Sequence, residues 1–107
     1  MSRLVLFGLA TLLVAAQSVA APPVATDTEV TIENFHFIPA TLKIAAGSSV
    51  TWTNKDDDVH TVMDAAGVFR SGALDGGQSF RYTFAKAGVY RIACSLHPQM
   101  SEVIVVE

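Results

Sequence analysis

The sequence predicts an all-β domain, a Greek-key sandwich or barrel of about seven to eight strands. Short stretches such as Glu29–Glu33 and Val50–Thr53 alternate polar and apolar residues, which is typical of strands buried on one face. Glycine and proline separate these stretches, and no amphipathic helix is evident after residue 20. Together these observations favour two packed β-sheets over a helical architecture.

The same alternation places the expected strands along the chain. Pro39 is expected at a sheet edge or a bulge, because proline has no amide to donate to a neighbouring strand. The glycine-rich stretch from Met63 to Ser79 is expected to be mostly loop, with a single helical turn as the alternative. Strands are expected at residues 29–33, 35–44 with an interruption at Pro39, 50–53, 60–63, 80–84, 89–94 and 102–106.

The first twenty residues are typical of an export signal. Met1–Arg3 is a short positive start, and the apolar run Leu4–Ala16 is shorter than the roughly 20 residues that span a bilayer. Small residues follow, and cleavage after Ala20 leaves a signal peptide of residues 1–20 and a mature domain of residues 21–107. Cleavage one residue later and a retained anchor helix are the alternatives. We therefore expect a periplasmic protein without stable membrane insertion.

The composition of the mature part excludes several classes of protein. About 87 residues are enough for one hydrophobic core and too few for two domains. Without Arg3 the chain carries six basic and ten acidic residues, a net charge of −4, so nucleic acid is not an expected partner. Cys94 is the single cysteine, which excludes disulfide exchange within the chain and calls for another role for this thiol.

Potential metal ligands recur at every third residue in Cys94–Met100. Cys94, His97 and Met100 supply a thiolate, an imidazole and a thioether on a loop that leaves a predicted strand, and His60 supplies a second imidazole from mid-chain. Two histidines and one cysteine with a long axial methionine form the ligand set of blue-copper sites. The sequence therefore predicts one copper ion, cycling between Cu(I) and Cu(II), at these four residues.

Each of the four residues also has a simpler interpretation. Cys94 and Met100 suit a hydrophobic core, and His60 and His97 suit a surface. Zinc is the competing metal, but a thioether is a poor ligand for it. The prediction of copper rests on the combination of ligand types, their order and the predicted export.

Several segments of residues 21–107 resemble the cupredoxin family, and within it the amicyanin-like and plastocyanin-like members. The segments are Phe35–Pro39, Val50–Asn54, Ala87–Tyr90 and Cys94–Met100. The spacing Cys-x-x-His-x-x-Met is similar to the compact ligand loop of amicyanin, whereas plastocyanin has a longer gap before the methionine. The resemblance implies a cupredoxin domain over residues 21–107, copper bound by the four residues named above, and electron transfer through the exposed edge of His97.

Three residues depart from the family pattern. Thr61 replaces an asparagine, so the contact that braces the ligand loops is expected to be weaker or to be made by the hydroxyl. Leu96 replaces the proline of amicyanin and restores an amide that can donate to the Cys94 sulfur, which is expected to raise the reduction potential. Glu102 replaces a common glycine, for which the sequence offers no physical reason.

The expected function is transfer of single electrons between redox partners, such as a c-type cytochrome or a periplasmic dehydrogenase or oxidase. The protein is expected to act as a monomer. The alternative is a copper protein for storage or delivery of the ion. An enzyme is not expected, because copper enzymes of related fold need further histidine-rich centres and only His36 remains. The acidic run Asp56–Asp58 is interpreted either as a patch that steers a basic partner or as a solvated loop.

Overall fold

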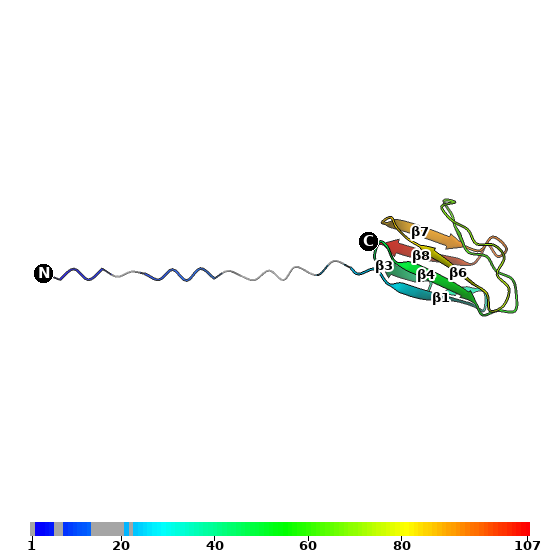
Figure 1. The fold of residues 1–107 in the computed structure, drawn as a ribbon, viewed down its shortest axis with the longest axis horizontal. Helices are drawn as coiled ribbons and strands as arrows, with labels where there is room; N and C mark the ends of the chain where they lie inside the picture. Colours follow the sequence, from blue (N-terminus) through cyan, green and yellow to red (C-terminus); the bar gives the residue numbers. More distant parts are fainter. Residues whose placement is uncertain (1, 6–7, 14–20, 22) are drawn as a thin grey trace.

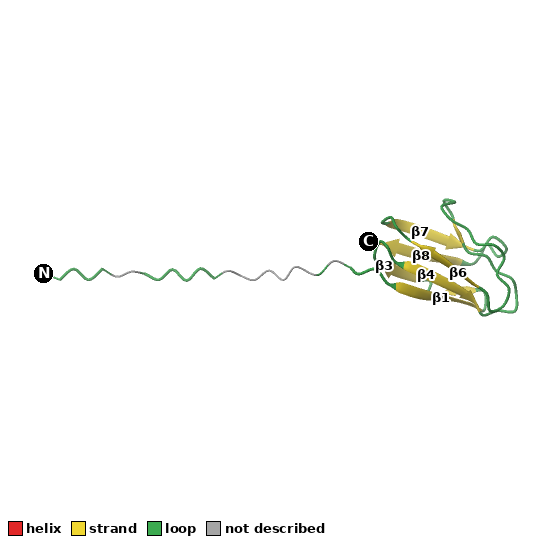
Figure 2. Ribbon diagram, in the orientation of Figure 1, coloured by secondary structure: helices red, strands yellow, loops and turns green. Residues whose placement is uncertain are grey.

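The computed structural model describes residues 2–5, 8–13, 21 and 23–107. These residues form eight strands and no helix (Figures 1 and 2). The strands are β1 (Asp27–Glu33), β2 (His36–Ile38), β3 (Thr41–Ile44), β4 (Ser49–Asn54), β5 (Met63–Asp64), β6 (Ser79–Thr83), β7 (Gly88–Ala93) and β8 (Ser101–Val106). The predicted all-β fold is confirmed.

The strands form two four-stranded sheets that pack face to face (Figure 1). One sheet has the order β2-β1-β4-β6 and the other the order β3-β8-β7-β5. β1 pairs with β4 and β3 pairs with β8 in parallel, and the remaining pairs are antiparallel. Pro39 lies between β2 and β3, which are both edge strands, in agreement with its predicted place at a sheet edge.

The hydrophobic core lies between the sheets and follows from the alternation in the strands. In β1, Val30 and Ile32 are buried while Glu29 and Glu33 are exposed, as the period of two requires. Trp52 in the central strand β4 is fully buried and packs against Phe69, Phe80 and Phe84. Its indole Nε1 donates a hydrogen bond of 2.8 Å to Glu102 on the opposite sheet, so a polar contact crosses the core.

The segment between β4 and β6 differs in detail from the predicted strand at residues 60–63. The strand there is β5, which begins at Met63, because His60 instead forms an isolated bridge with Leu74. Backbone hydrogen bonds join His60 and Leu74 in both directions, at 3.1 and 2.8 Å. No helical turn is present in residues 65–78. This paired loop, together with the loop after β7, forms one end of the sandwich (Figure 1).

The predicted signal peptide lies only partly within the described residues. Residues 14–20, including the expected cleavage point after Ala20, lie outside them. Residues 2–5 and 8–13 form no helix or strand. Among the described residues, none belongs to a helix that meets the length and hydropathy needed to span a bilayer.

Candidate metal centre

Three of the four predicted ligands converge at the end of the sandwich that carries the loops after β4 and β7. The metal-binding atoms of His60, Cys94 and His97 all lie within 4.8 Å of one another. His60 Nδ1 is 3.1 Å from His97 Nδ1, and the Cys94 sulfur is 3.6 Å from His97 Nδ1. His60 and Cys94 are buried and His97 is half-buried. The fold therefore carries the mid-chain histidine to the C-terminal ligand loop.

The loop that carries His60 is fixed by Asn54, the last residue of β4. The buried Asn54 amide donates to the carbonyl oxygens of Asp58 and Leu74 at 2.8 and 2.9 Å. Its oxygen accepts from the Asp56 amide at 2.9 Å. Because these bonds hold the chain on both sides of His60, the position of the imidazole is set by backbone and side-chain contacts before any metal arrives.

Asp56 determines which nitrogen of His60 is free for a metal. His60 Nε2 lies 2.8 Å from Asp56 Oδ2, and an ionised carboxylate only accepts hydrogen bonds, so Nε2 carries the proton. Partial burial alone would raise the pKa of Asp56, but the amides of Phe35 and Asn34 and the His60 imidazole lower it below the usual range. His60 Nδ1 is then left with a lone pair directed at the cluster.

The surroundings of Cys94 favour the thiolate. Burial alone would raise the pKa of the thiol, but hydrogen bonds from the Thr61 amide and hydroxyl, the Leu96 amide and His97 together lower it. The Thr61 amide and hydroxyl lie 3.3 and 3.7 Å from the sulfur. A thiolate is the form of cysteine that binds metals. The predicted donation from the Leu96 amide is consistent with its contribution to this shift.

Thr61 also braces the two ligand loops through its hydroxyl. Thr61 Oγ1 accepts a hydrogen bond from the Ser95 amide at 2.8 Å and lies 2.8 Å from the Ser95 hydroxyl. Of the two outcomes expected for this position, the structure has the hydroxyl bond. It joins the segment after His60 to the segment after Cys94 and holds the two buried ligands in register.

His97 and Met100 complete the ligand loop. The Met100 amide donates to the His97 carbonyl at 2.9 Å, which closes a tight turn. Met100 is 2% exposed and belongs to the same buried cluster as Cys94. His97 is half-buried, and its neighbour Leu96 is 53% exposed. The imidazole of His97 is thus the ligand nearest to solvent.

The donor set fits a copper ion. Ligand atoms that share one ion through bonds of about 2.0–2.3 Å lie about 3–4 Å apart, which matches the separations of His97 Nδ1 from His60 Nδ1 and from the Cys94 sulfur. Two imidazoles and one thiolate, on loops that also carry the buried Met100, suit copper, which accepts both soft sulfur and imidazole ligands. Three residues from two loops supply the two imidazoles and the thiolate of the predicted ligand set, and the role of Met100 stays a prediction.

Two residues near the centre were not predicted from the sequence. Phe35 was expected to be a strand residue, but it lies in the turn between β1 and β2 with a φ of 61°. Its ring centroid is 5.1 Å from that of His60 and 4.9 Å from that of His97, in edge-on contact. Asp56 was grouped with Asp57 and Asp58, yet only the latter two are exposed. Nothing in the sequence distinguishes Asp56 except its place four residues before His60.

Glu102 is buried beside the core and not at the surface. Its Oε1 accepts the Trp52 hydrogen bond, and its Oε2 has no hydrogen-bond partner among the described residues. Burial raises the pKa of Glu102 to about 7, against the lowering effect of the Trp52 hydrogen bond. The departure from the family glycine thus has a structural role, a bond between the two sheets.

Comparison with known proteins identifies the family. The family model of the cupredoxin-like domain matches residues 4–106. The chain belongs to the cupredoxin family. The family and the sandwich fold predicted from the sequence are confirmed.

The relatives of this cupredoxin in sequence are amicyanins. It is 38% identical to amicyanin from Paracoccus denitrificans over 71 residues, which are 62% of this chain and 54% of the relative. The match to this relative thus spans about half of the relative's length. It is 34% identical to amicyanin-alpha from Methylorubrum extorquens over 88 residues, 78% of this chain and 74% of the relative.

Solved structures with the same fold include a purple cupredoxin, an amicyanin variant and a nitrite reductase. A purple cupredoxin from Nitrosopumilus maritimus has a TM-score of 0.69 and 29% identity, covering 76% of this cupredoxin and all of that chain. A Cu(I) structure of an amicyanin variant has a TM-score of 0.72 and 28% identity, covering 80% and 92%. A copper-containing nitrite reductase from Thermus scotoductus has a TM-score of 0.70 and 28% identity, but only 25% of that chain is covered.

Proposed function

We propose that this cupredoxin is a blue-copper protein that carries single electrons, with copper held by His60, Cys94, His97 and, as the long axial ligand, Met100. The observation that carries the proposal is the convergence of two imidazole nitrogens and one thiol sulfur within 4.8 Å. The comparisons support it, because relatives in sequence are amicyanins and amicyanin variants of the same fold are described in their Cu(I) form. When bound, the copper supplies the one-electron couple.

The chain's own residues account for the remaining requirements of electron transfer. The hydrogen bonds around Cys94 and the brace between Thr61 and Ser95 fix the buried ligands, so little rearrangement accompanies a change of charge. His97 lies at the surface end of the site and provides the path to a partner. A protein that stores or delivers copper must release the ion readily. Ligands that are held in place and largely buried oppose such release.

Visible spectroscopy tests the proposal. One equivalent of Cu(II) added to the purified protein should produce the intense visible band of a copper–thiolate bond. Cys94→Ala should abolish the band, and His36→Ala should leave it unchanged, since His36 is exposed and forms a hydrogen bond to the Asn34 carbonyl, away from the cluster. A wild-type protein without the band, or a band that survives in Cys94→Ala, would refute the proposed site.

We infer that the protein is not an enzyme. The likeness to nitrite reductase covers a quarter of that chain and supports no more than a shared domain. Among the described residues, a single group of histidine, cysteine and carboxylate side chains lies close enough to hold a metal. Rapid electron exchange between Cu(I) and Cu(II) forms, without turnover of nitrite, is the expected behaviour.

Export and partners complete the proposal. Residues 1–20 act as a signal peptide, and residues 21–107 form the mature monomeric domain in the periplasm. The mass of protein from the periplasmic fraction tests this, since cleavage after Ala20 predicts a chain that begins at Ala21.

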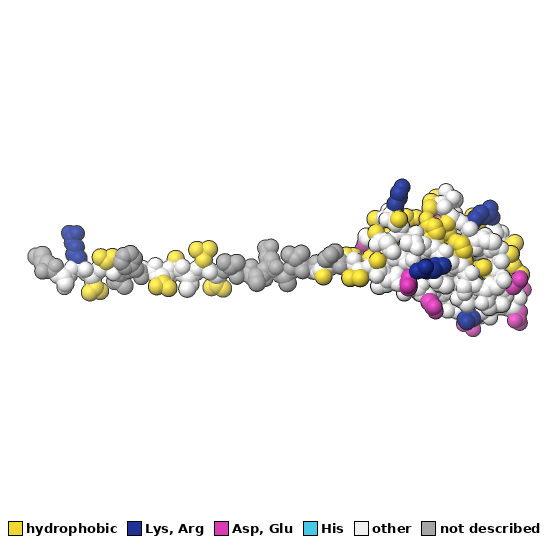
Figure 3. All heavy atoms as spheres, in the orientation of Figure 1, with side chains coloured by type: hydrophobic (Ala, Val, Ile, Leu, Met, Phe, Trp, Pro, Cys, Tyr) yellow, Lys and Arg dark blue, Asp and Glu magenta, His cyan; other side chains and the backbone are white. Residues whose placement is uncertain are grey.

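The acidic side chains near the loop end of the sandwich (Figure 3) suit a basic redox partner such as a c-type cytochrome, and a periplasmic dehydrogenase or oxidase is the other candidate.

A further inference from the structure

The turn between β1 and β2 adopts a conformation that its residues do not favour. Asn34 and Phe35 have φ values of 54° and 61°, in the left-handed region. Two-residue hairpin turns of this kind usually contain glycine at the second position. Asparagine tolerates the region, but a bulky aromatic residue is an outlier there and needs contacts that hold it. The structure provides these contacts from a different loop.

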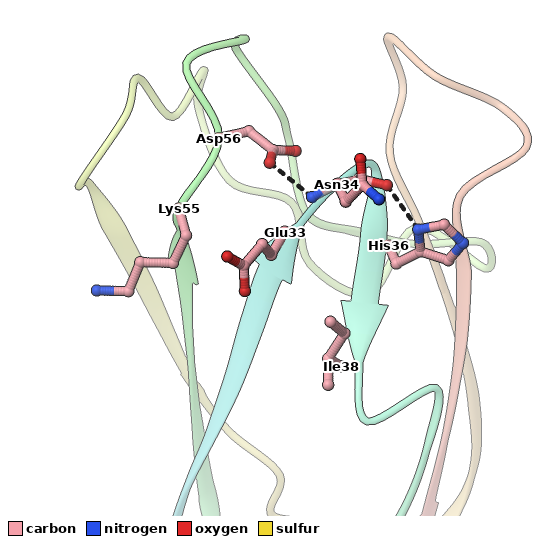
Figure 4. A pocket seen from close by; sticks show the side chains of 6 residues that line it. All are labelled: Glu33, Asn34, His36, Ile38, Lys55 and Asp56. Carbon is pink, nitrogen blue, oxygen red and sulfur yellow. Dashed lines mark hydrogen bonds between the residues drawn. The ribbon is translucent and has the colours of Figure 1, made fainter.

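A single carboxylate binds both the turn and the histidine ligand. Asp56 Oδ1 accepts a hydrogen bond from the Asn34 amide at 2.6 Å, and Asp56 Oδ2 accepts from the Phe35 amide at 2.9 Å and from His60 Nε2 at 2.8 Å. Figure 4 shows the Asp56 side chain reaching from its loop to Asn34 at the end of the hairpin. The carboxylate therefore couples two segments that lie more than twenty residues apart.

The loop that carries Asp56 is itself held closely. The Asp56 amide donates to Asn54 Oδ1. Gly76 lies against the Asp56 carbonyl so closely that a Cβ there would be 2.9 Å from the carbonyl oxygen. The backbone of Asp56 is thus closely held on its own loop, and its carboxylate is in place to bind the turn.

The consequence of this anchoring is the position of the Phe35 ring. The ring contacts the imidazoles of both His60 and His97 edge-on, at centroid distances of 5.1 and 4.9 Å. Phe35 is 36% exposed, so one side of the ring faces solvent while the other covers the two histidines. A ring so placed stands between the solution and the side of the cluster on which His97 lies.

We propose that Asp56 is a positioning residue that locks His60 and the Asn34–Phe35 turn into one unit, and that the Phe35 ring thereby keeps small ligands in solution away from the metal position. The covering role of Phe35 rests on the proposed function, because it requires a bound metal. The locking of the turn is a property of the protein without metal. The two parts are therefore tested separately.

Binding of azide to the Cu(II) protein tests the covering role. Phe35→Asn removes the ring and introduces a residue that tolerates the left-handed region, so the turn should persist. Azide should then bind roughly tenfold more tightly, because it no longer has to displace the ring from its contacts with the two histidines. Asp56→Ala should have a similar effect because it frees the turn, whereas Asp57→Ala, at an exposed neighbouring position, should bind azide as the wild type does. Unchanged azide affinity in Phe35→Asn would overturn the covering role, even if Asp56→Ala fails to fold.

Nuclear magnetic resonance of the metal-free protein tests the locking. Contacts between the Phe35 ring protons and those of His60 and His97 should be observed in the wild type and in Asp57→Ala and lost in Asp56→Ala. If these contacts persist without the carboxylate, Asp56 does not hold the turn. Absence of a copper–thiolate band in the wild type would count against the proposed function and the covering role. It would leave the locking untouched, since the resonance measurement does not involve copper.

Discussion

At the scale of single residues, the environment of Cys94 determines the relative affinity of the proposed site for Cu(I) and Cu(II), and hence its reduction potential. The sulfur receives hydrogen bonds from Thr61, and the Leu96 amide contributes to its lowered pKa. Donors to sulfur stabilise the electron-rich reduced site and raise the reduction potential. Each donor is therefore a means of setting the potential without changing a ligand.

Leu96→Pro should lower the reduction potential because proline has no amide to donate. A lost hydrogen bond to a charged sulfur of about 1.4 kcal/mol corresponds to about 60 mV for one electron. Leu96→Ala keeps the amide and removes an exposed side chain, so its potential should stay near that of the wild type. Voltammetry of the three proteins measures the difference, and an equal or higher potential in the proline variant would argue against a role for this amide.

Glu102 should make the metal-free protein less stable as the pH rises. Its pKa is raised from 4.5 to about 7, so the folded state favours the neutral acid. The contribution to stability is full below about pH 4.5 and is lost as the pH rises through 7, by about 3 kcal/mol in total. Glu102→Gln cannot titrate, so the difference in unfolding free energy between the two proteins should change over this range in favour of the variant.

Denaturant unfolding at pH 5 and pH 8 measures this change. Asp56 and Cys94, whose pKa values are lowered, affect both proteins alike and cancel in the comparison. A difference between wild type and Glu102→Gln that is the same at both pH values would show that the carboxyl is not held neutral by burial.

Residue types and spacing made the candidate ligands predictable, but not the residues that position them. The ligand types recur at every third residue, at Cys94, His97 and Met100, so one short segment is enough to identify them as possible metal ligands. Asp56 and Phe35 act through contacts between loops from different parts of the chain, and no local pattern encodes such contacts. Glu102 was unexplained for the same reason, since its partner Trp52 lies fifty residues away.

At the scale of elements, the loop after β4 depends on close packing against the loop before β6. Gly76 approaches Asp56 so closely that a Cβ would lie 2.9 Å from the Asp56 carbonyl oxygen, whereas a Cβ at Gly72 would meet nothing within 4 Å. The two glycines thus offer a matched pair for testing how firmly this loop is held.

Gly76→Ala should destabilise the protein by about 1–3 kcal/mol, because backbone atoms must shift to admit the methyl group. Gly72→Ala should stay within about 0.5 kcal/mol of the wild type, as expected for a surface change without close contacts. Thermal or denaturant unfolding compares the two. Equal effects of both substitutions would show that the loop of Asp56 yields easily.

The longer strands were predictable from the sequence, and the two-residue strand β5 was not. Alternation identifies β1, β4 and β8 because each buries one side of its residues against the opposite sheet. β5 has two residues, and its place depends on pairing with β7 and on the bridge between Met63 and Arg70. The parallel pairing of β1 with β4 also lies beyond local pattern, since it joins strands that are not consecutive.

At the scale of the whole molecule, the candidate metal site joins loops from both sheets at one end of the sandwich. The loop with His60 leads from β4 in one sheet to β5 in the other, and Cys94 follows β7. A metal that binds these loops together stabilises the folded state only, because the unfolded chain does not bring the ligands together. The family match confirms the class of domain that the sequence predicts, and the bounds of that domain, residues 21–107, stay a prediction.

Copper should therefore raise the unfolding temperature. At a free concentration of one hundred times the dissociation constant, the gain is about 2.7 kcal/mol, which calorimetry detects as a clear shift of the midpoint. The Cys94→Ala variant should show little or no shift under the same conditions. A similar rise in both proteins would mean that copper binds elsewhere on the chain.

The most direct measurement is X-ray absorption at the copper edge of the loaded wild-type protein. A copper ion held by the imidazoles of His60 and His97 and the thiolate of Cys94 predicts one short copper–sulfur bond and two copper–nitrogen bonds. The sulfur signal should be lost in Cys94→Ala. A first shell of nitrogen and oxygen alone in the wild type would contradict the assignment of this cluster as a blue-copper site.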